Sequence, residues 1–344
     1  MTNPQWNNLK AVVNGETLSP LPVGFIIDSP WLPNWYGIDI LDYFSSDQLW
    51  LEANLKAIDT FPDAIFLPGF WAEYGMCSEP SAFGAQSAFP QNEFPHAFPN
   101  IRSPEEIGSL EVPDPVKDGL GPLMLNRLRL NQPLIEQAGH KIRFSISRGP
   151  LNIASYLMGA TEFMMAMMTH PEETHLLIRK ITDYLTGFHN HQAELFPSID
   201  GILMLDDIIG FISEEQFVEF GLPYFKELYD RNLSVKFLHN DANCMESVHY
   251  LPEMGVNLFN MGFETDLNQL KELTGNQVTM LGNIPPRDVL ALGSAAQVKD
   301  VTQQLLKGLK DPSRVIFSCG GGMPPGVTSE NLAIFIQTVQ TFKP

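Results

Sequence analysis

The sequence is poor in the residue types that would point to several common classes of protein. Cysteine occurs three times, at Cys77, Cys244 and Cys319, and no two form a CxxC pair. A disulfide framework is therefore not expected, and this cysteine content is consistent with a reducing compartment. Lysine and arginine number 21 against 40 aspartates and glutamates, which gives a formal net charge of −19. This acidity, without a clustered basic stripe, argues against binding to nucleic acid or to an anionic membrane.

Long apolar runs are also lacking. No segment approaches the roughly 20 apolar residues needed to span a bilayer, and residues 1–6 lack the basic and then apolar build of a signal peptide. We therefore expect a cytoplasmic protein with no membrane segment. The chain does have length and apolar content, because 344 residues, 44% of them hydrophobic, suffice for one large domain with a well-buried core.

Eight short apolar runs recur along the chain, and each is followed by polar or glycine-rich residues and then by a stretch with helical periodicity. Runs this short and this apolar are typical of strands buried on both faces, as in a parallel sheet. Their alternation with helices predicts an α/β fold, a single (β/α)8 TIM barrel over residues 1–344. The predicted strands are Val23–Asp28, Ala64–Pro68, Ile142–Ser147, Gly201–Asp207, Val235–Asp241, Asn257–Gly262, Val278–Asn283 and Val315–Gly320.

The connection between the second and third predicted strands, about residues 69–141, is longer than a barrel connection needs, so it is predicted to be an insertion. Residues 78–99 are rich in Pro, Phe, Ser and Gly, which predicts an irregular loop over one mouth of the barrel. Residues 115–138 are predicted to be partly helical. Further helices are predicted over Pro171–Leu195, after the capping Ser213, and from about Ser329.

In such barrels the reaction site lies at the C-terminal ends of the strands, so polar residues there are the candidates. Asp206 and Asp207 point to opposite faces of their strand, and we expect Asp207 to enter the barrel. Glu73 follows the aromatic pair Phe70 and Trp71, which is typical of a small-molecule pocket, although a buried loop anchor explains it equally well. The other strand-end groups are Asp28, Arg148, His239, Asp241, Asn260, Asn283 and Cys319.

Two of these groups have a structural alternative. His239 could simply hydrogen-bond a backbone carbonyl, and Cys319 could be a small core residue. In favour of a site, Cys319 directly precedes three glycines, which allow a ligand to approach the backbone closely.

Several segments resemble the uroporphyrinogen decarboxylase superfamily, which also contains the cobalamin-dependent methyltransferases. The resemblance covers roughly residues 140–344 and implies an enzyme with the TIM-barrel fold. The segments that carry it are Leu205–Ile208, Ile212–Phe217, Leu222–Tyr224, His239–Asp241, Leu281–Ile284, Gly320–Gly326 and Glu330–Asn331.

Members that carry out the namesake decarboxylation have arginines after the first strand, which hold the carboxylates of the substrate. The corresponding stretch here, Asp28–Tyr36, contains no arginine. A carboxylate-rich tetrapyrrole would therefore meet an acidic mouth, and unpaired carboxylates in a partly dry site cost several kcal/mol each. A metal-free uroporphyrinogen-type decarboxylase is the alternative hypothesis rather than the leading one.

The resemblance to the methyltransferase branch implies a zinc site. Zinc-dependent members bind the metal with a His-x-Cys pair and a cysteine on the last strand, and the matching residues here are His239, Asp241 and Cys319. All three are ordinary zinc ligands, and three protein ligands with an open fourth position are typical of catalytic zinc. Asp241, which replaces a cysteine, could instead orient His239 without touching the metal.

The leading hypothesis is therefore a zinc-assisted, corrinoid-dependent methyltransferase. In that branch a methyl group moves between a small molecule and the cobalt of a separate corrinoid protein. The chain has no Asp-x-His-x-x-Gly segment of the corrinoid-binding kind, so methylcobalamin or another corrinoid would come from that partner. A non-catalytic binder of corrinoid or porphyrin is a third hypothesis.

The direction of transfer follows from the ligand set. A carboxylate in place of a thiolate makes zinc a stronger Lewis acid, which favours demethylation over transfer to a zinc-bound thiolate. The donor would be a methoxylated aromatic or another methylated small molecule. We expect Glu73 or Asp207 to act as the acid. The expected substrate-binding residues are Trp31, Phe70, Trp71, Arg148 and Asn283.

Overall fold

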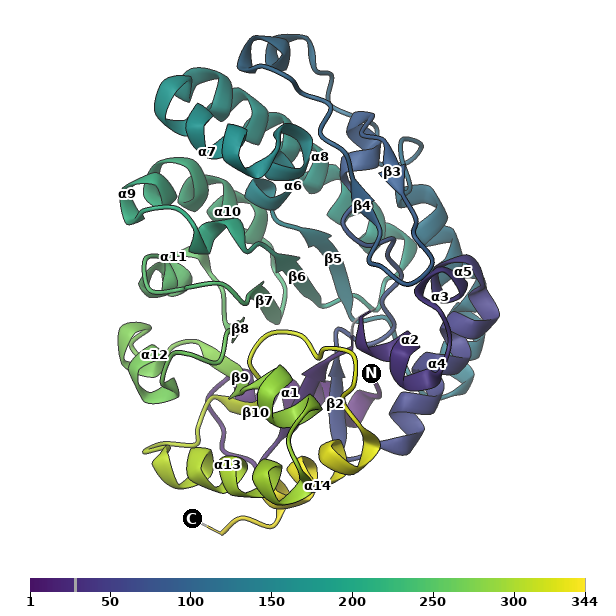
Figure 1. The fold of residues 1–344 in the computed structure, drawn as a ribbon, viewed down its shortest axis with the longest axis vertical. Helices are drawn as coiled ribbons and strands as arrows, with labels where there is room; N and C mark the ends of the chain where they lie inside the picture. Colours follow the sequence, from purple (N-terminus) through teal and green to yellow (C-terminus); the bar gives the residue numbers. More distant parts are fainter. Residues whose placement is uncertain (28–29, 344) are drawn as a thin grey trace.

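A computed structural model describes residues 1–27 and 30–343, and its centre is an eight-stranded parallel sheet curled around an interior (Figure 1). Neighbours in the sheet follow the order β2-β1-β10-β9-β8-β7-β6-β5. Every predicted apolar run forms one of these strands, so the TIM-barrel fold is confirmed. The strands are β1 (Val23–Ile26), β2 (Ala64–Leu67), β5 (Phe144–Arg148), β6 (Gly201–Leu205), β7 (Val235–Asn240), β8 (Leu258–Met261), β9 (Thr279–Ile284) and β10 (Val315–Cys319).

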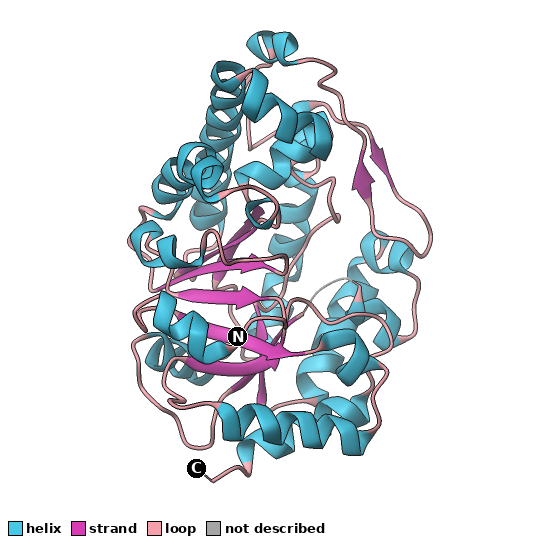
Figure 2. Cartoon of the chain, turned by 60° about the vertical axis from the view of Figure 1, so that its left-hand side comes forward, coloured by secondary structure: helices cyan, strands magenta, loops and turns pink. Residues whose placement is uncertain are grey.

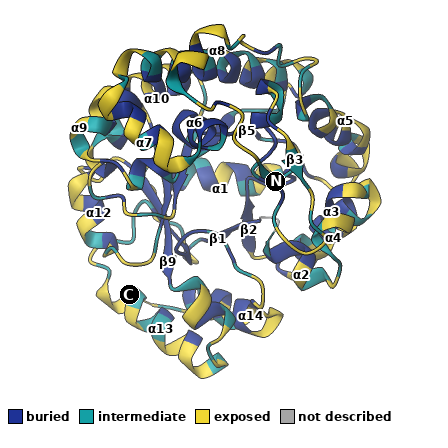
Figure 3. Ribbon diagram, turned by 45° about the horizontal axis from the view of Figure 1, so that its top comes forward, coloured by how far each residue is buried: buried dark blue, intermediate teal, exposed yellow. Residues whose placement is uncertain are grey.

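Helices surround the sheet, and their outer faces are the exposed ones (Figures 2 and 3). The predicted helix Pro171–Leu195 coincides with α8, and Ser213 caps α9 through a capping box with Gln216. In the described part of the chain, no helix combines the length and hydropathy of a membrane span. The other helices are α1 (Asn3–Val13), α2 (Trp31–Tyr36), α3 (Ile40–Ser45), α4 (Asp47–Thr60), α5 (Gly121–Gln137), α6 (Pro150–Met158), α7 (Ala160–Thr169), α10 (Leu222–Tyr229), α11 (Leu251–Met254), α12 (Leu267–Leu273), α13 (Ala295–Gly308) and α14 (Ser329–Gln340), with α9 spanning Glu214–Gln216.

Alternate residues of each strand pack into two separate hydrophobic clusters. Phe144, Phe237 and Ile316 belong to the cluster inside the barrel, together with Trp6 from α1, whose ring centroid lies 5.4 Å from that of Phe144. Helix α1 thus closes the N-terminal mouth of the barrel. The second cluster, which contains Phe317, lies between the strands and the helices. The side of the strand on which a residue falls therefore decides whether it can reach the barrel interior.

The predicted insertion lies between β2 and β5, the two strands at the open edges of the sheet. Among the described residues, no ladder of hydrogen bonds joins these two strands. Instead, residues 69–141 hold two 3-10 segments, the two-residue strands β3 (Ser87–Ala88) and β4 (His96–Ala97), and α5. The first part of the insertion is irregular and reaches over the C-terminal mouth, as its composition predicts, because several of its residues line the cavity there.

Candidate functional site

A cavity of about 180 Å³ lies at the C-terminal ends of the strands. This is the end at which TIM barrels carry their reaction sites. Three parts of the chain build its walls: the strand ends with the loops after them, the insertion, and α6. The strand ends and the loops after them contribute Ile26, Pro30, Arg148, Leu205, Asp207, His239, Asp241 and Gly322. The insertion contributes Trp71, Glu73, Met76 and Phe94, and α6 contributes Asn152 and Tyr156.

Asp207, His239 and Asp241 form a group that can hold a metal ion. Each offers one ligand atom within 4.8 Å of the other two. Nε2 of His239 lies 3.8 Å from Oδ2 of Asp241, and the backbone N–H of Asp241 donates to Oδ1 of Asp207 at 3.0 Å. Ligand atoms on a tetrahedral zinc lie about 3.4 Å apart, so small side-chain rotations bring these atoms to a common ion. One imidazole and two carboxylates suit zinc or a harder divalent cation.

Asn260 sets the orientation and tautomer of His239. The Nδ2 amide of Asn260 donates to the carbonyl of Leu281 at 2.7 Å, which leaves its Oδ1 facing Nδ1 of His239 at 2.7 Å. Because an amide oxygen only accepts, Nδ1 carries the hydrogen and Nε2 presents a lone pair. An imidazole held in this way is typical of a metal ligand. Nδ1 of His239 therefore bonds the side-chain oxygen of Asn260 and not a backbone carbonyl, unlike the structural alternative considered for this residue.

The two adjacent aspartates take opposite positions, as predicted. Asp207 lines the cavity, whereas Asp206 is fully buried on the other face of the strand. There, Oδ2 of Asp206 accepts from the backbone N–H groups of Leu151 at 2.9 Å and Asn152 at 3.1 Å, in the first turn of α6. Burial raises the pKa of Asp206 to about 8, and burial also raises the pKa of Asp207.

The raised pKa of Asp206 predicts a pH dependence of stability. The folded protein holds this proton more tightly than the unfolded chain, so the contribution of Asp206 is full below pH 3.8 and is lost as the pH rises to about 8. Asp206→Asn keeps an acceptor for the two N–H groups and removes the titration. In urea unfolding at about pH 5 and pH 8, we expect it to flatten the decline seen in the parent protein. Asp183→Asn, an exposed control, should keep the parental slope; equal slopes for all three proteins would contradict the assignment.

Cys319 is not part of the metal-capable group, which corrects the predicted ligand set. Ser318 lies on the same side of β10 as Ile316, which packs inside the barrel, so the next residue, Cys319, lies on the other side. Cys319 instead faces the helix layer with Phe317, where it is fully buried, and its Sγ donates to the carbonyl of Gly321 at 3.6 Å. The structure thus joins His239 and Asp241 with Asp207 rather than with Cys319.

Three of the predicted substrate-binding residues do not line the cavity. Trp31 is fully buried, and its Nε1 donates to the carbonyl of Val327 at 3.2 Å. Phe70 packs edge-on against Trp50. The Nδ2 amide of Asn283 donates to the carbonyl of Thr265 at 2.7 Å and so anchors the loop after β8. These side chains support the mouth without entering it. Asp28 lies outside the described residues.

Arg148 does line the cavity, but its charge is already paired. Its Nη2 donates to Oε2 of Glu73 at 2.7 Å, and its Nη1 lies 3.6 Å from Oε2 of Glu79. The backbone N–H of Arg148 donates to the other oxygen of Glu79 at 2.9 Å. All three side chains are buried. The predicted substrate-binding arginine therefore holds two carboxylates of the protein itself, one of them the predicted acid Glu73.

Sequence reasoning missed Asn152 and Tyr156, which α6 presents to the cavity. Oδ1 of Asn152 accepts from the backbone N–H groups of Asp207 at 3.0 Å and Ile208 at 3.2 Å, so it holds the turn after β6. Burial raises the pKa of Tyr156, so its hydroxyl keeps its proton at neutral pH. The two lie one turn apart on one face of the helix. That spacing was visible in the sequence, but nothing placed this helix at the strand ends.

The glycine run after β10 is required by close packing at the site. Gly321 has φ +73°, and a Cβ there would lie 2.8 Å from Oδ2 of Asp241. A side chain at this position would therefore displace the Asp241 carboxylate. Gly322 lines the cavity itself, which agrees with the predicted use of the run for close approach.

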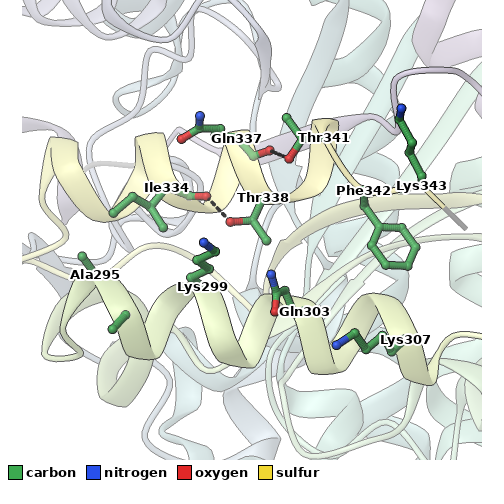
Figure 4. A pocket seen from close by; sticks show the side chains of 11 residues that line it. Ala295, Lys299, Gln303, Lys307, Ile334, Gln337, Thr338, Thr341, Phe342 and Lys343 are labelled. Atoms are coloured by element: carbon green, nitrogen blue, oxygen red, sulfur yellow. Dashed lines mark hydrogen bonds between the residues drawn. The ribbon is translucent and has the colours of Figure 1, made fainter.

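A larger groove, of about 600 Å³, lies between α13 and α14 at the surface (Figure 4). Among its lining residues are exposed Lys299 and Lys307, and none of the described lining residues is a histidine, cysteine or acid. The hydroxyls of Thr338 and Thr341 donate to carbonyls of their own helix. The described lining of the groove thus lacks the usual metal ligands.

The family follows from comparison with known proteins. A model of the family described as uroporphyrinogen decarboxylase (URO-D) matches residues 7–342. The chain belongs to the URO-D family. The resemblance read from the sequence is confirmed and extends to the N-terminal half, and the protein is an enzyme of the URO-D superfamily.

Curated relatives of this URO-D family protein are named as decarboxylases. The uroporphyrinogen decarboxylase of Aeromonas salmonicida (strain A449) is 23% identical over 317 residues, which cover 88% of this chain and 85% of the relative. That of Idiomarina loihiensis is 25% identical over 280 residues, 77% of this chain and 75% of the relative. These names favour the decarboxylase alternative.

Solved structures with this fold include a methyltransferase and a methionine synthase. A methyltransferase from Methanosarcina mazei superposes with a TM-score of 0.82 at 18% identity, over 97% of this chain and 98% of that one. A B12-independent methionine synthase from Shewanella sp. W3-18-1, in complex with selenomethionine, superposes with a TM-score of 0.58 at 10% identity, over 93% and 97% of the two chains. At these identities the likeness establishes the fold.

Proposed function

We propose that this URO-D family protein is a methyltransferase that takes a methyl group from a small donor and delivers it to the corrinoid cobalt of a partner protein. The observation that carries the proposal is the group Asp207, His239 and Asp241 at the wall of a strand-end cavity. The superposition with a methyltransferase over nearly the whole chain supports it.

The donor set fits zinc, with Asp207, His239 and Asp241 as the proposed ligands. Zinc bound there would act as a Lewis acid that polarises the heteroatom carrying the methyl group. The chain itself supplies the arrangement: Asn260 keeps the lone pair of Nε2 of His239 available, and Asn152 holds the turn that carries Asp207. Asp207, predicted as an acid, is thus proposed to be a ligand.

Tyr156 is the proposed hydrogen-bond donor to the departing heteroatom. Tyr156 lines the cavity and, because burial raises its pKa, its hydroxyl carries a proton throughout the neutral range. Glu73 is less suited to this role than the sequence indicates, because it accepts a hydrogen bond from Arg148 at 2.7 Å. We propose that Glu73 instead contributes negative charge to the cavity wall.

The decarboxylase alternative is favoured by the names of the curated relatives. The cavity argues against it on two counts. Its volume of about 180 Å³ is below the roughly 300–1,000 Å³ that drug-sized ligands occupy, and a tetrapyrrole is larger still. Among the described lining residues, Arg148 is the one arginine, and its guanidinium is held by Glu73 and Glu79.

The proposal is tested by mixing zinc-loaded protein with a reduced corrinoid protein and a panel of methoxylated and methylated donors. We expect zinc-dependent methylation of the cobalt, followed by its visible absorption spectrum, with at least one donor. His249→Ala, which alters a surface histidine paired with Glu214, should keep the activity. Turnover of a carboxylated tetrapyrrole by the metal-free protein, with no methylation from any donor, would reverse the choice of function.

A further inference from the structure

The buried cluster Arg148, Glu73 and Glu79 gives the cavity wall an excess negative charge. One guanidinium lies between two carboxylates, at 2.7 Å from Glu73 and 3.6 Å from Glu79, so the cluster carries a formal charge of −1. Asp207 and Asp241, which follow the neighbouring strands β6 and β7, add two carboxylates to the lining. A divalent cation bound by those two aspartates would cancel their charge, but it would leave the excess of the arginine cluster in place.

The same cavity has no spare cation for an anionic ligand. No lysine and no second arginine occur among the described residues that line it. A carboxylate or phosphate entering the cavity would lose its hydration and meet acids, with Arg148 already engaged on both sides. The charge of the metal-free wall therefore disfavours anions.

Aromatic side chains and a thioether complete the wall. Trp71 is 94% buried yet lines the cavity, and Phe94, Tyr156 and Met76 line it as well. Aromatic rings attract a cation through their quadrupole, most strongly where water is excluded, and Trp is the best of them. Rings combined with carboxylates form the type of surface that recognises quaternary ammonium groups.

We infer that this cavity selects a small methylated ammonium cation rather than an anion or a neutral molecule of the same shape. The inference rests on the lining of the cavity and not on the proposed methyl transfer. The volume of about 180 Å³ suits such a small group.

The test is calorimetric titration of the intact protein, with and without zinc, by choline and by 3,3-dimethylbutan-1-ol. The two probes have nearly the same shape, but a carbon replaces the charged nitrogen in the second. We expect choline to bind at least tenfold more tightly, a difference of about 1.4 kcal/mol. Glu73→Gln should reduce this preference to within about threefold, whereas Asp183→Asn, an exposed acid on α8, should leave it unchanged.

Trp71→Leu provides a second variant if Glu73→Gln fails to fold, as judged by its thermal unfolding. Loss of the ring face should weaken choline several-fold more than it weakens the neutral probe. Equal affinity for the two probes, tighter binding of the neutral probe, or no binding of either probe would each overturn the inference. Because the titration needs no corrinoid protein, its outcome is independent of the methyl-transfer assay.

Discussion

Replacing Arg148 with methionine should lower the free energy of unfolding by about 3–5 kcal/mol, because the change leaves two buried carboxylates without their counter-charge. Glu73 and Glu79 are each 2% exposed, so water cannot replace the guanidinium. The effect should be large although methionine fills much of the same volume. It arises from the uncompensated charges rather than from lost packing.

Urea unfolding at fixed pH measures this change, and Arg179→Met is the matched control. Arg179 pairs with Glu227 at 2.7 Å at the surface, where such pairs contribute about 0–1 kcal/mol. Adding Glu73→Gln and Glu79→Gln to Arg148→Met should recover most of the lost stability, since the buried charges are then gone. A loss no larger than that of Arg179→Met would show that the cluster is not buried as described.

Removing the imidazole of His239 should abolish zinc binding and lower the rate of methyl transfer on the order of 10³-fold or more, since the metal supplies several kcal/mol of stabilisation to the reaction. Cys319→Ala should retain both zinc and activity. Its side chain faces the helix layer, away from the cavity that His239 lines.

Metal content per chain, measured by inductively coupled plasma mass spectrometry, separates the two ligand sets. Asp207→Asn should reduce the bound zinc, as His239→Ala does, while Cys319→Ala should keep about one zinc per chain. Loss of zinc from Cys319→Ala together with its retention in Asp207→Asn would restore the ligand set predicted from the sequence. Thermal unfolding of each variant controls for loss of the fold.

The barrel could be predicted because its strands are apolar on both faces, and this leaves a signal in the sequence that does not depend on tertiary contacts. Each of the eight predicted runs forms a strand. The position of the site followed from the same signal, since His239 and Asp241 come where an apolar run stops. Because adjacent residues of a strand face opposite sides, at most one of Asp206 and Asp207 was expected to face the barrel, and Asp207 lines the cavity there.

The side of the strand that Cys319 faces could not be predicted in this way. A one-residue difference in register exchanges the two faces of a strand, and the sequence alone did not indicate that Ser318, rather than Cys319, faces inward. The pairing of Arg148 with Glu73 joins residues 75 positions apart, and Tyr156 reaches the cavity from a helix. Contacts of this kind depend on how the insertion and α6 pack on the barrel, which no local pattern records.

Anomalous scattering at the zinc edge, from crystals grown with zinc, tests the account most directly. We expect one strong peak between Nε2 of His239 and the carboxylates of Asp207 and Asp241. The absence of a peak there, or a peak at the sulfur of Cys319, would contradict the proposed metal centre.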